Sequence, residues 1–159
     1  MKTRFSRRFA FASALLASAL VPTIALAADA PTPDDPADAA YGEMQQMFGG
    51  VPSFTKAFPR AGIAGAWAEL RDLQFSDKTA LDAKTKALIS LAVSAQIPCT
   101  YCIYADTMSA KKAGATEQEI QEAVAMAAIT RHWSTVLNGM QVDFETFKKE
   151  MSREMGTSK

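Results

Sequence analysis

The length of 159 residues suits one compact domain, and the chain holds 17 basic and 17 acidic residues. Four of the basic residues and none of the acidic ones fall within residues 1–27, so the rest of the chain carries 13 basic and 17 acidic groups, a net charge of −4. A mildly acidic surface argues against nucleic acid or an anionic membrane as the main partner.

Residues 1–27 have the pattern of a secretory signal peptide. Basic residues come first, an apolar run from Phe9 to Leu20 follows, and the small-residue tripeptide Ala25-Leu26-Ala27 ends the segment. A membrane anchor is the alternative, but serine, threonine and proline interrupt the stretch, and a spanning helix needs ~20 strongly apolar residues. Ser6-Arg7-Arg8 leaves the choice between general and twin-arginine export open. We therefore expect a periplasmic or secreted protein that is not membrane-bound after cleavage.

Residues 28–37 are rich in proline and aspartate and predict a flexible lead-in. Beyond it, helix caps and apolar residues at helical spacing predict successive helices. The expected elements are a helix from Pro36 to about Phe48, a turn-rich connector from Val51 to Pro59, a helix from Ala61 to Leu73, a helix opened by a capping box of Thr79 and Asp82, a helix from Cys99 to near Gly114, a helix opened by a capping box of Thr116 and Glu119, and a final helix from about Val142 to Met155.

The sequence contains no alternating strand pattern and no hairpin turn between apolar runs. We therefore predict an all-α fold, a single helical domain of about six helices over residues 38–155, with a frayed tail at residues 156–159.

The two cysteines, Cys99 and Cys102, are the strongest functional signal. A structural disulfide stabilises mainly by closing a long loop, and this pair closes almost none, so a redox-active pair is the better interpretation. Pro98 interrupts the preceding helix, so Cys99 begins the next one, where the helix dipole stabilises a thiolate. If Cys99 is buried, Cys102 becomes the attacking residue instead. Tyr101 and Tyr104 flank the pair. Their phenol groups could hydrogen-bond a peroxide oxygen, but we expect both side chains to pack in the core.

Two further residues are candidates for proton transfer. Asp106 falls on the same helix face as Cys99 and Cys102, and His132 is the only histidine of the chain. Together these four residues could also bind zinc, but there is no second CxxC motif or histidine pair to support a metal site. We expect neither a metal nor another cofactor.

Four passages between about Trp67 and Phe147 follow one another in a distinctive order: residues 86–93, residues 98–103, residues 113–116 and residues 119–124. In this order they resemble the carboxymuconolactone decarboxylase-like superfamily, and specifically its alkylhydroperoxidase D-like branch. The resemblance implies a helical domain that assembles into trimers or hexamers. It also implies a cysteine pair that reduces hydroperoxides and is reduced again by a thiol or dithiol donor. The decarboxylases of the superfamily lack the CxxC motif, so its presence favours the peroxidase branch.

Two positions depart from the pattern of that branch, which has a glutamate twelve residues before the first cysteine and a histidine four after the second. Here these positions hold Ala87 and Asp106. Alanine cannot move a proton, and an unperturbed aspartate has a pKa of about 3.9, far from the near-neutral value of a good general base. An ionised Asp106 would also repel a thiolate one turn away. His132, on a later helix, could replace the missing relay.

The expected function is therefore that of a thiol-dependent peroxidase acting through Cys99 and Cys102, with Asp106 and His132 as proton-transfer residues. Two alternatives remain open. One is a thiol–disulfide exchange or redox-sensing protein with little peroxidase activity, which the altered relay positions favour. The other is a non-catalytic helical oligomer or small-molecule binder that shares the fold.

Overall fold

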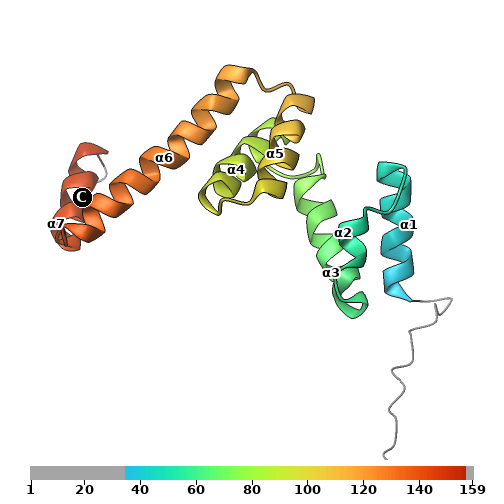
Figure 1. The fold of residues 1–159 in the computed structure, drawn as a ribbon. Coiled ribbons are helices and arrows are strands. Elements are labelled where there is room, and N and C mark those ends of the chain that lie inside the picture. The colour runs from blue at the N-terminus through green and yellow to red at the C-terminus, as the bar shows by residue number, and fades with distance from the viewer. Residues whose placement is uncertain (1–34, 157–159) are drawn as a thin grey trace, which may run out of the picture. The chain divides into compact units, whose positions relative to one another are not determined.

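The computed structural model describes residues 35–156, and this part of the chain contains seven α-helices and no strand (Figure 1). The all-α prediction is confirmed. The signal peptide predicted at residues 1–27, most of the lead-in and the last three residues of the tail lie outside the described residues. The helices are α1 (Pro36–Phe48), α2 (Ser53–Lys56), α3 (Arg60–Glu69), which continues as the π-helical turn η1 (Leu70–Gln74), α4 (Ala83–Gln96), α5 (Thr100–Lys112), α6 (Glu117–Gly139) and α7 (Phe144–Glu154).

Helices α1 and α3 pack against each other around Met44 and Trp67, whose side chains are both buried. The indole Nε1 of Trp67 donates a hydrogen bond of 2.6 Å to Oε2 of Glu43, and Nη1 of Arg71 donates to the same oxygen at 2.7 Å. The polar edge of the buried indole therefore has a partner, as a buried tryptophan normally requires.

Helices α4, α5 and α6 enclose a second apolar cluster, and α4 lies beside α5 (Figure 1). Leu91 of α4 is fully buried, and the alanines Ala87 and Ala110 let α4 and α5 approach closely around it. Ile120 adds the contact from α6. This cluster fixes the helix from which both cysteines project.

Two helix ends have the capping residues that the sequence predicts. Thr116 accepts a hydrogen bond from the N–H of Glu119 at 3.1 Å, and the Glu119 carboxylate accepts one from the N–H of Thr116 at 2.7 Å, which forms the predicted capping box of α6. Gly114 has a φ of +84°, a left-handed conformation that suits glycine just after α5.

The start of α4 differs from its prediction. The helix begins at Ala83 instead of near Thr79, and Asp82 is its N-cap, accepting a hydrogen bond of 2.8 Å from the N–H of Thr85. The pair of Thr79 and Asp82 is therefore not a capping box, because aspartate is itself a strong N-cap for the residue three positions later.

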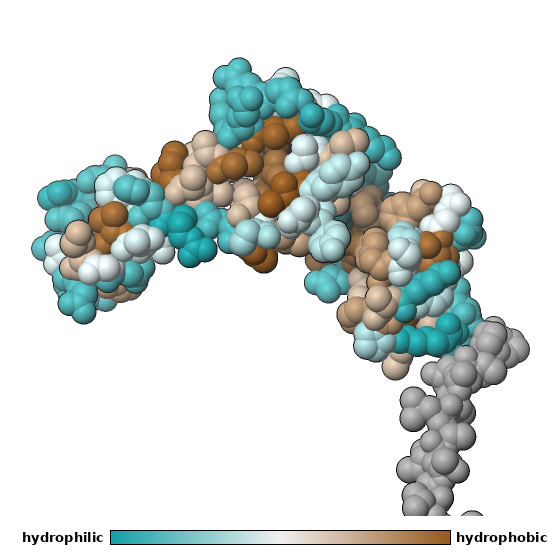
Figure 2. Space-filling view, in the orientation of Figure 1, coloured by the Kyte–Doolittle hydropathy of each residue, from teal (hydrophilic) through white to brown (hydrophobic). Residues whose placement is uncertain are grey.

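Two smaller differences concern the segment before α4. The connector predicted from Val51 to Pro59 contains the short helix α2, and the helix predicted to run to Leu73 changes from α- to π-helical geometry at Leu70. None of the described helices is long and apolar enough to cross a membrane. Apolar side chains nevertheless remain on the surface, seen as brown patches between teal ones on the face drawn in Figure 2.

Candidate functional site

Cys99 and Cys102 form a disulfide at the beginning of α5, with their Cα atoms 5.3 Å apart. Helix α4 ends at Gln96, Pro98 follows, and Cys99 is the N-cap of α5. The break at the proline thus places the first cysteine where the amide groups of a new helix are still unpaired. One helical turn then brings the second sulfur into bonding distance.

The two sulfurs have different surroundings. Sγ of Cys99 accepts a hydrogen bond of 3.2 Å from the backbone N–H of Cys102, and the Cys99 residue is half-buried, whereas Cys102 is exposed. A negative charge on the Cys99 sulfur would be stabilised by this N–H group and by the positive end of the helix dipole. The pair therefore has one cysteine that is exposed to solution and one half-buried cysteine at a helix N-terminus.

Asp106 is half-buried one turn after Cys102. Burial raises the pKa of Asp106 above its ordinary value, and the side chain of Ser94 on α4 partly opposes that rise. The direction is important, because the sequence alone predicts an unperturbed aspartate at this position. In the folded chain it holds a proton more firmly than a free aspartate does.

Ser94 itself was not singled out by the sequence analysis. It is almost fully buried, and its Oγ donates a hydrogen bond of 3.0 Å to the carbonyl of Leu91. A signal did exist, since Ala87, Leu91 and Ser94 follow one another at the spacing of a buried helix face. A serine in such a stripe needs a polar partner.

Ala87, which holds the position of the missing glutamate, lies in the apolar cluster between α4 and α5. Its methyl group packs with Leu91 and Ala110, so this position contributes packing and no proton transfer.

His132 lies exposed on α6, and its ring meets the ring of Trp133 edge-on, with centroids 5.3 Å apart. The structure thus brings Cys99 and Cys102 together and places Asp106 on the same helix. The ring of His132 contacts the ring of Trp133. A relay role for His132 stays a prediction.

The two tyrosines beside the cysteines are exposed, so the expectation that they pack in the core is wrong. Helix α5 turns Ile103 and Ala110 toward the apolar cluster, which leaves Tyr101 and Tyr104 on other faces. A shallow hollow of about 420 Å³ lies along α5, next to the cysteines in sequence, and it is lined by Thr100, Ile103, Tyr104, Thr107 and Met108. An apolar molecule that approaches the disulfide along α5 would meet this surface.

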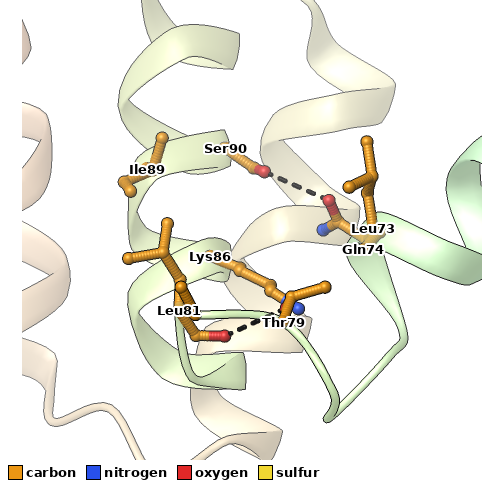
Figure 3. A pocket seen from close by; sticks show the side chains of 8 residues that line it. Leu73, Gln74, Thr79, Leu81, Lys86, Ile89 and Ser90 are labelled. Carbon is orange, nitrogen blue, oxygen red and sulfur yellow. Dashed lines mark hydrogen bonds between the residues drawn. The ribbon is translucent and has the colours of Figure 1, made fainter.

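A second hollow, of about 270 Å³, lies between η1, the segment before α4 and α4 itself (Figure 3). Its polar groups have partners, since Nζ of Lys86 donates to the carbonyl of Ser76 at 2.6 Å and Oγ of Ser90 lies 3.5 Å from Oε1 of Gln74. No cysteine lines it, so we do not assign the sulfur chemistry to this hollow. Within residues 35–156, no group of three or more histidine, cysteine or acidic side chains is arranged to hold a metal ion.

Comparison with known proteins bears on the family and the fold of this chain. The model of the carboxymuconolactone decarboxylase family matches residues 61–143. An uncharacterised protein of the cox locus of Paracoccus denitrificans is 39% identical over 71 residues, which cover 45% of this chain and 63% of the relative, so the match spans less than two thirds of that protein. The crystal structure of the alkylhydroperoxidase AhpD core of Rhodospirillum rubrum has the same fold, with a TM-score of 0.61 and 24% identity, over 70% of this chain and 85% of that one.

Proposed function

Because the chain belongs to the carboxymuconolactone decarboxylase family, we propose that it is a thiol-dependent peroxidase that reduces hydroperoxides through Cys99 and Cys102. The observation that carries the proposal is the disulfide at the N-terminus of α5, formed by one exposed and one half-buried cysteine. The likeness to the fold of an alkylhydroperoxidase core supports it. A disulfide that closes so short a loop adds little to stability, so its formation and cleavage are better explained by redox chemistry.

The proposed oxidative half-reaction uses both cysteines. A thiolate of the pair attacks the distal oxygen of a hydroperoxide, the O–O bond breaks, and the alkoxide leaves with a proton as an alcohol. The attacking sulfur becomes a sulfenic acid, and the second cysteine displaces its hydroxyl group as water to give the disulfide. Two electrons thus pass from the two sulfurs to the peroxide.

In the reductive half-reaction, an external dithiol attacks the exposed sulfur of Cys102. The Cys99 sulfur leaves as a thiolate, which the N–H of Cys102 and the helix dipole stabilise, and a better-stabilised leaving thiolate departs faster. The second thiol of the donor then releases Cys102, so the donor ends as a disulfide. This order follows from the difference in exposure between the two cysteines.

A peroxide-consumption assay with an organic hydroperoxide and a dithiol tests the proposal. The variants Cys99→Ser and Cys102→Ser should each abolish turnover. The matched control Ser109→Ala, which removes one oxygen from the same helix, should retain it. Consumption by the wild type no faster than by Cys102→Ser would remove the peroxidase proposal.

The second candidate function is disulfide exchange with a partner protein and little peroxidase activity. It is favoured by Ala87, whose buried methyl group stands at the relay position, and by the exposed Cys102. A measurable reduction potential and exchange with a dithiol protein, together with negligible peroxide consumption, would support this function over the first.

The proposed working form is a homo-oligomer that joins through α6. Met126, Ile129, Trp133, Val136 and Met140 follow one another at alternating spacings of three and four residues. This spacing is typical of a seam that packs against another helix. The side chains of Met126, Trp133 and Met140 are 58%, 55% and 76% exposed, so the seam has room for a partner helix. A second copy is the proposed occupant, because few charges flank the seam to select another partner.

Light scattering across a concentration series tests this assembly. The variant Trp133→Ser should lower the oligomer mass toward that of one chain, whereas Phe144→Ser, which changes another exposed aromatic residue outside the seam, should not. A wild-type mass equal to one chain at every concentration would contradict the oligomer. A trimer or hexamer is the size that the resemblance implies.

The proposed place of action is the periplasm or the medium outside the cell, supported by the signal-peptide pattern of residues 1–27. Sequencing of the N-terminus of the exported protein should find cleavage near Ala27. Full-length protein retained in the cytoplasm would contradict this proposal.

A further inference from the structure

The hollow between η1, the segment before α4 and α4 itself combines apolar walls with one positive charge (Figure 3). Its volume of about 270 Å³ equals the space of roughly nine water molecules at ~30 Å³ each. Leu73, Leu81 and Ile89 supply apolar walls, and Lys86 and Ser90 add an ammonium group and a hydroxyl group. Apolar walls with a few polar groups are the usual composition of a small-molecule site.

The apolar walls of this hollow are open to solution. The residues Leu73, Leu81 and Ile89 are 60%, 47% and 49% exposed. Single exposed apolar residues are common on protein surfaces, but these three surround one hollow. Covering them with an apolar group is favourable in proportion to the area removed from water. The hollow therefore favours a ligand with an apolar part.

Lys86 brings a charge into the hollow that no acidic side chain of residues 35–156 balances. The residue is half-buried, and its Nζ donates a hydrogen bond of 2.6 Å to the carbonyl of Ser76, which is a neutral acceptor. None of the ion pairs within the described residues includes Lys86. Asp82, the nearest acidic residue in sequence, instead caps α4 by accepting a hydrogen bond from the N–H of Thr85. An ammonium group has further N–H donors, so Lys86 can also bind an anion.

Ser90 lines the same hollow one helical turn after Lys86. Its Oγ lies 3.5 Å from Oε1 of Gln74, which is longer than an ordinary hydrogen bond between such oxygens. The hydroxyl hydrogen is therefore only weakly held and can donate to a better acceptor. Figure 3 shows the Lys86 and Ser90 side chains extending from α4 on the side where Gln74 and Thr79 lie. Two donors thus face the hollow from one helix.

We propose that this hollow binds a monocarboxylate with a short apolar tail, a ligand of the medium-chain fatty acid class. The carboxylate accepts hydrogen bonds from Nζ of Lys86 and Oγ of Ser90, and the tail covers the apolar walls. One ammonium group balances one negative charge, whereas a phosphate dianion would retain an unpaired charge at considerable cost. No cysteine lines the hollow, so this binding does not depend on the proposed peroxidase function.

Titration of the full chain with octanoate, followed by ¹H–¹³C methyl NMR, tests the proposal. Octanoate should bind with a Kd of roughly 1 mM, as expected for a small ligand in an open site. The methyl signals of Leu81 and Ile89 should shift more than those of the fully buried Leu91. Octan-1-ol, which lacks the charge, should bind about tenfold more weakly. Shorter carboxylates should bind about two- to fourfold more weakly for each methylene removed.

Variants of Lys86 test the charge directly. Lys86→Met keeps an unbranched apolar stem and should raise the Kd for octanoate about tenfold or more, because a charge-assisted hydrogen bond is lost. Lys86→Arg keeps the charge and should bind octanoate more tightly than Lys86→Met. The matched control is Lys112→Met at the end of α5, which makes the same change in net charge outside the hollow. It should stay within about twofold of the wild type, because salt screens exposed charges that do not contact the ligand.

Two results would overturn the proposal. One is the absence of any shift at the Leu81 and Ile89 methyl groups up to about 10 mM octanoate, whether no ligand binds or a second copy of the chain covers the hollow. The other is equal affinity of the wild type for octanoate and octan-1-ol, a comparison that holds even if Lys86→Met fails to fold. Octanoate binding without peroxide consumption would leave this site standing and remove only the peroxidase proposal.

Discussion

Replacing Leu91 with alanine is the sharpest test of the packing that holds the cysteine helix. Leu91 is 1% exposed, so the substitution removes three carbon atoms from a fully buried side chain. At about 0.8 kcal/mol for each buried methylene-sized group, the transfer contribution alone is roughly 2.4 kcal/mol. The cavity that remains adds to this loss.

The neighbours of Leu91 decide how large that cavity stays. Ala87 and Ala110 have no side-chain rotamers with which to fill it, and Ile120 approaches from a different helix. We therefore expect a loss of about 3 to 4 kcal/mol in the free energy of unfolding, within the range known for buried leucines. For a helical domain of this size, the melting temperature should fall by roughly 10 to 15 °C.

Urea unfolding at 25 °C, followed by circular dichroism, measures this loss. The matched control is Ile89→Ala on the same helix, where the side chain is 49% exposed and the expected loss is about 1 kcal/mol or less. Because α4 supports α5, Leu91→Ala should also speed reduction of the Cys99–Cys102 disulfide. A loss no larger than that of Ile89→Ala would refute the view that this cluster holds the site.

Three further predictions concern caps and charges. Thr116→Ala removes the N-cap of α6 and should lower the free energy of unfolding by about 1 kcal/mol in urea titration. The hydrogen bond from Lys84, followed by the N–H of Thr116, lowers the pKa of Glu119 from 4.5 to about 2. A carboxyl group whose pKa is lower in the folded than in the unfolded state stabilises the folded protein at pH values above the unfolded-state pKa. The wild type should therefore lose this stability as the pH falls from 4.5 toward 2. Glu119→Gln should lack this part of the pH dependence of the free energy of unfolding. Burial raises the pKa of Asp106 in the folded protein. The stability that this group contributes is therefore fully present at pH values below its unfolded-state pKa, and it is lost as the pH rises through its folded-state pKa. Asp106→Asn should therefore raise the melting temperature at pH 7 and leave it nearly unchanged at pH 3.

The helix ends could be predicted wherever the deciding residues are neighbours in sequence. Pro36 starts α1, Gly114 follows α5 with a positive φ, and Thr116 caps α6, each through contacts within about four residues. The start of α4 differs from its prediction because Thr79 and Asp82 have the spacing of a capping box, whereas in the structure Asp82 itself is the N-cap. Thr79 and Asp82 are both residue types that cap helices, so the preference for such residues at an N-cap could not decide which of the two begins α4.

The candidate site could be predicted along α5 and not across to α4. Helical periodicity is enough to align Cys99, Cys102 and Asp106 on one face. The half-burial of Asp106 depends on how closely the alanines of α4 and α5 let the two helices approach. The raised pKa of Asp106 depends on the same packing, which is why an ordinary aspartate was assumed from the sequence.

The asymmetry of the disulfide originates in the backbone break at Pro98. Had α4 continued through Cys99, the N–H of Cys102 would have served the helix and left no donor for the Cys99 sulfur. Because α4 stops, Cys99 becomes a cap, its sulfur receives that N–H, and its own N–H reaches back to Ser94. The break that gives the Cys99 sulfur its hydrogen-bond donor therefore also anchors Cys99 to the buried face of α4.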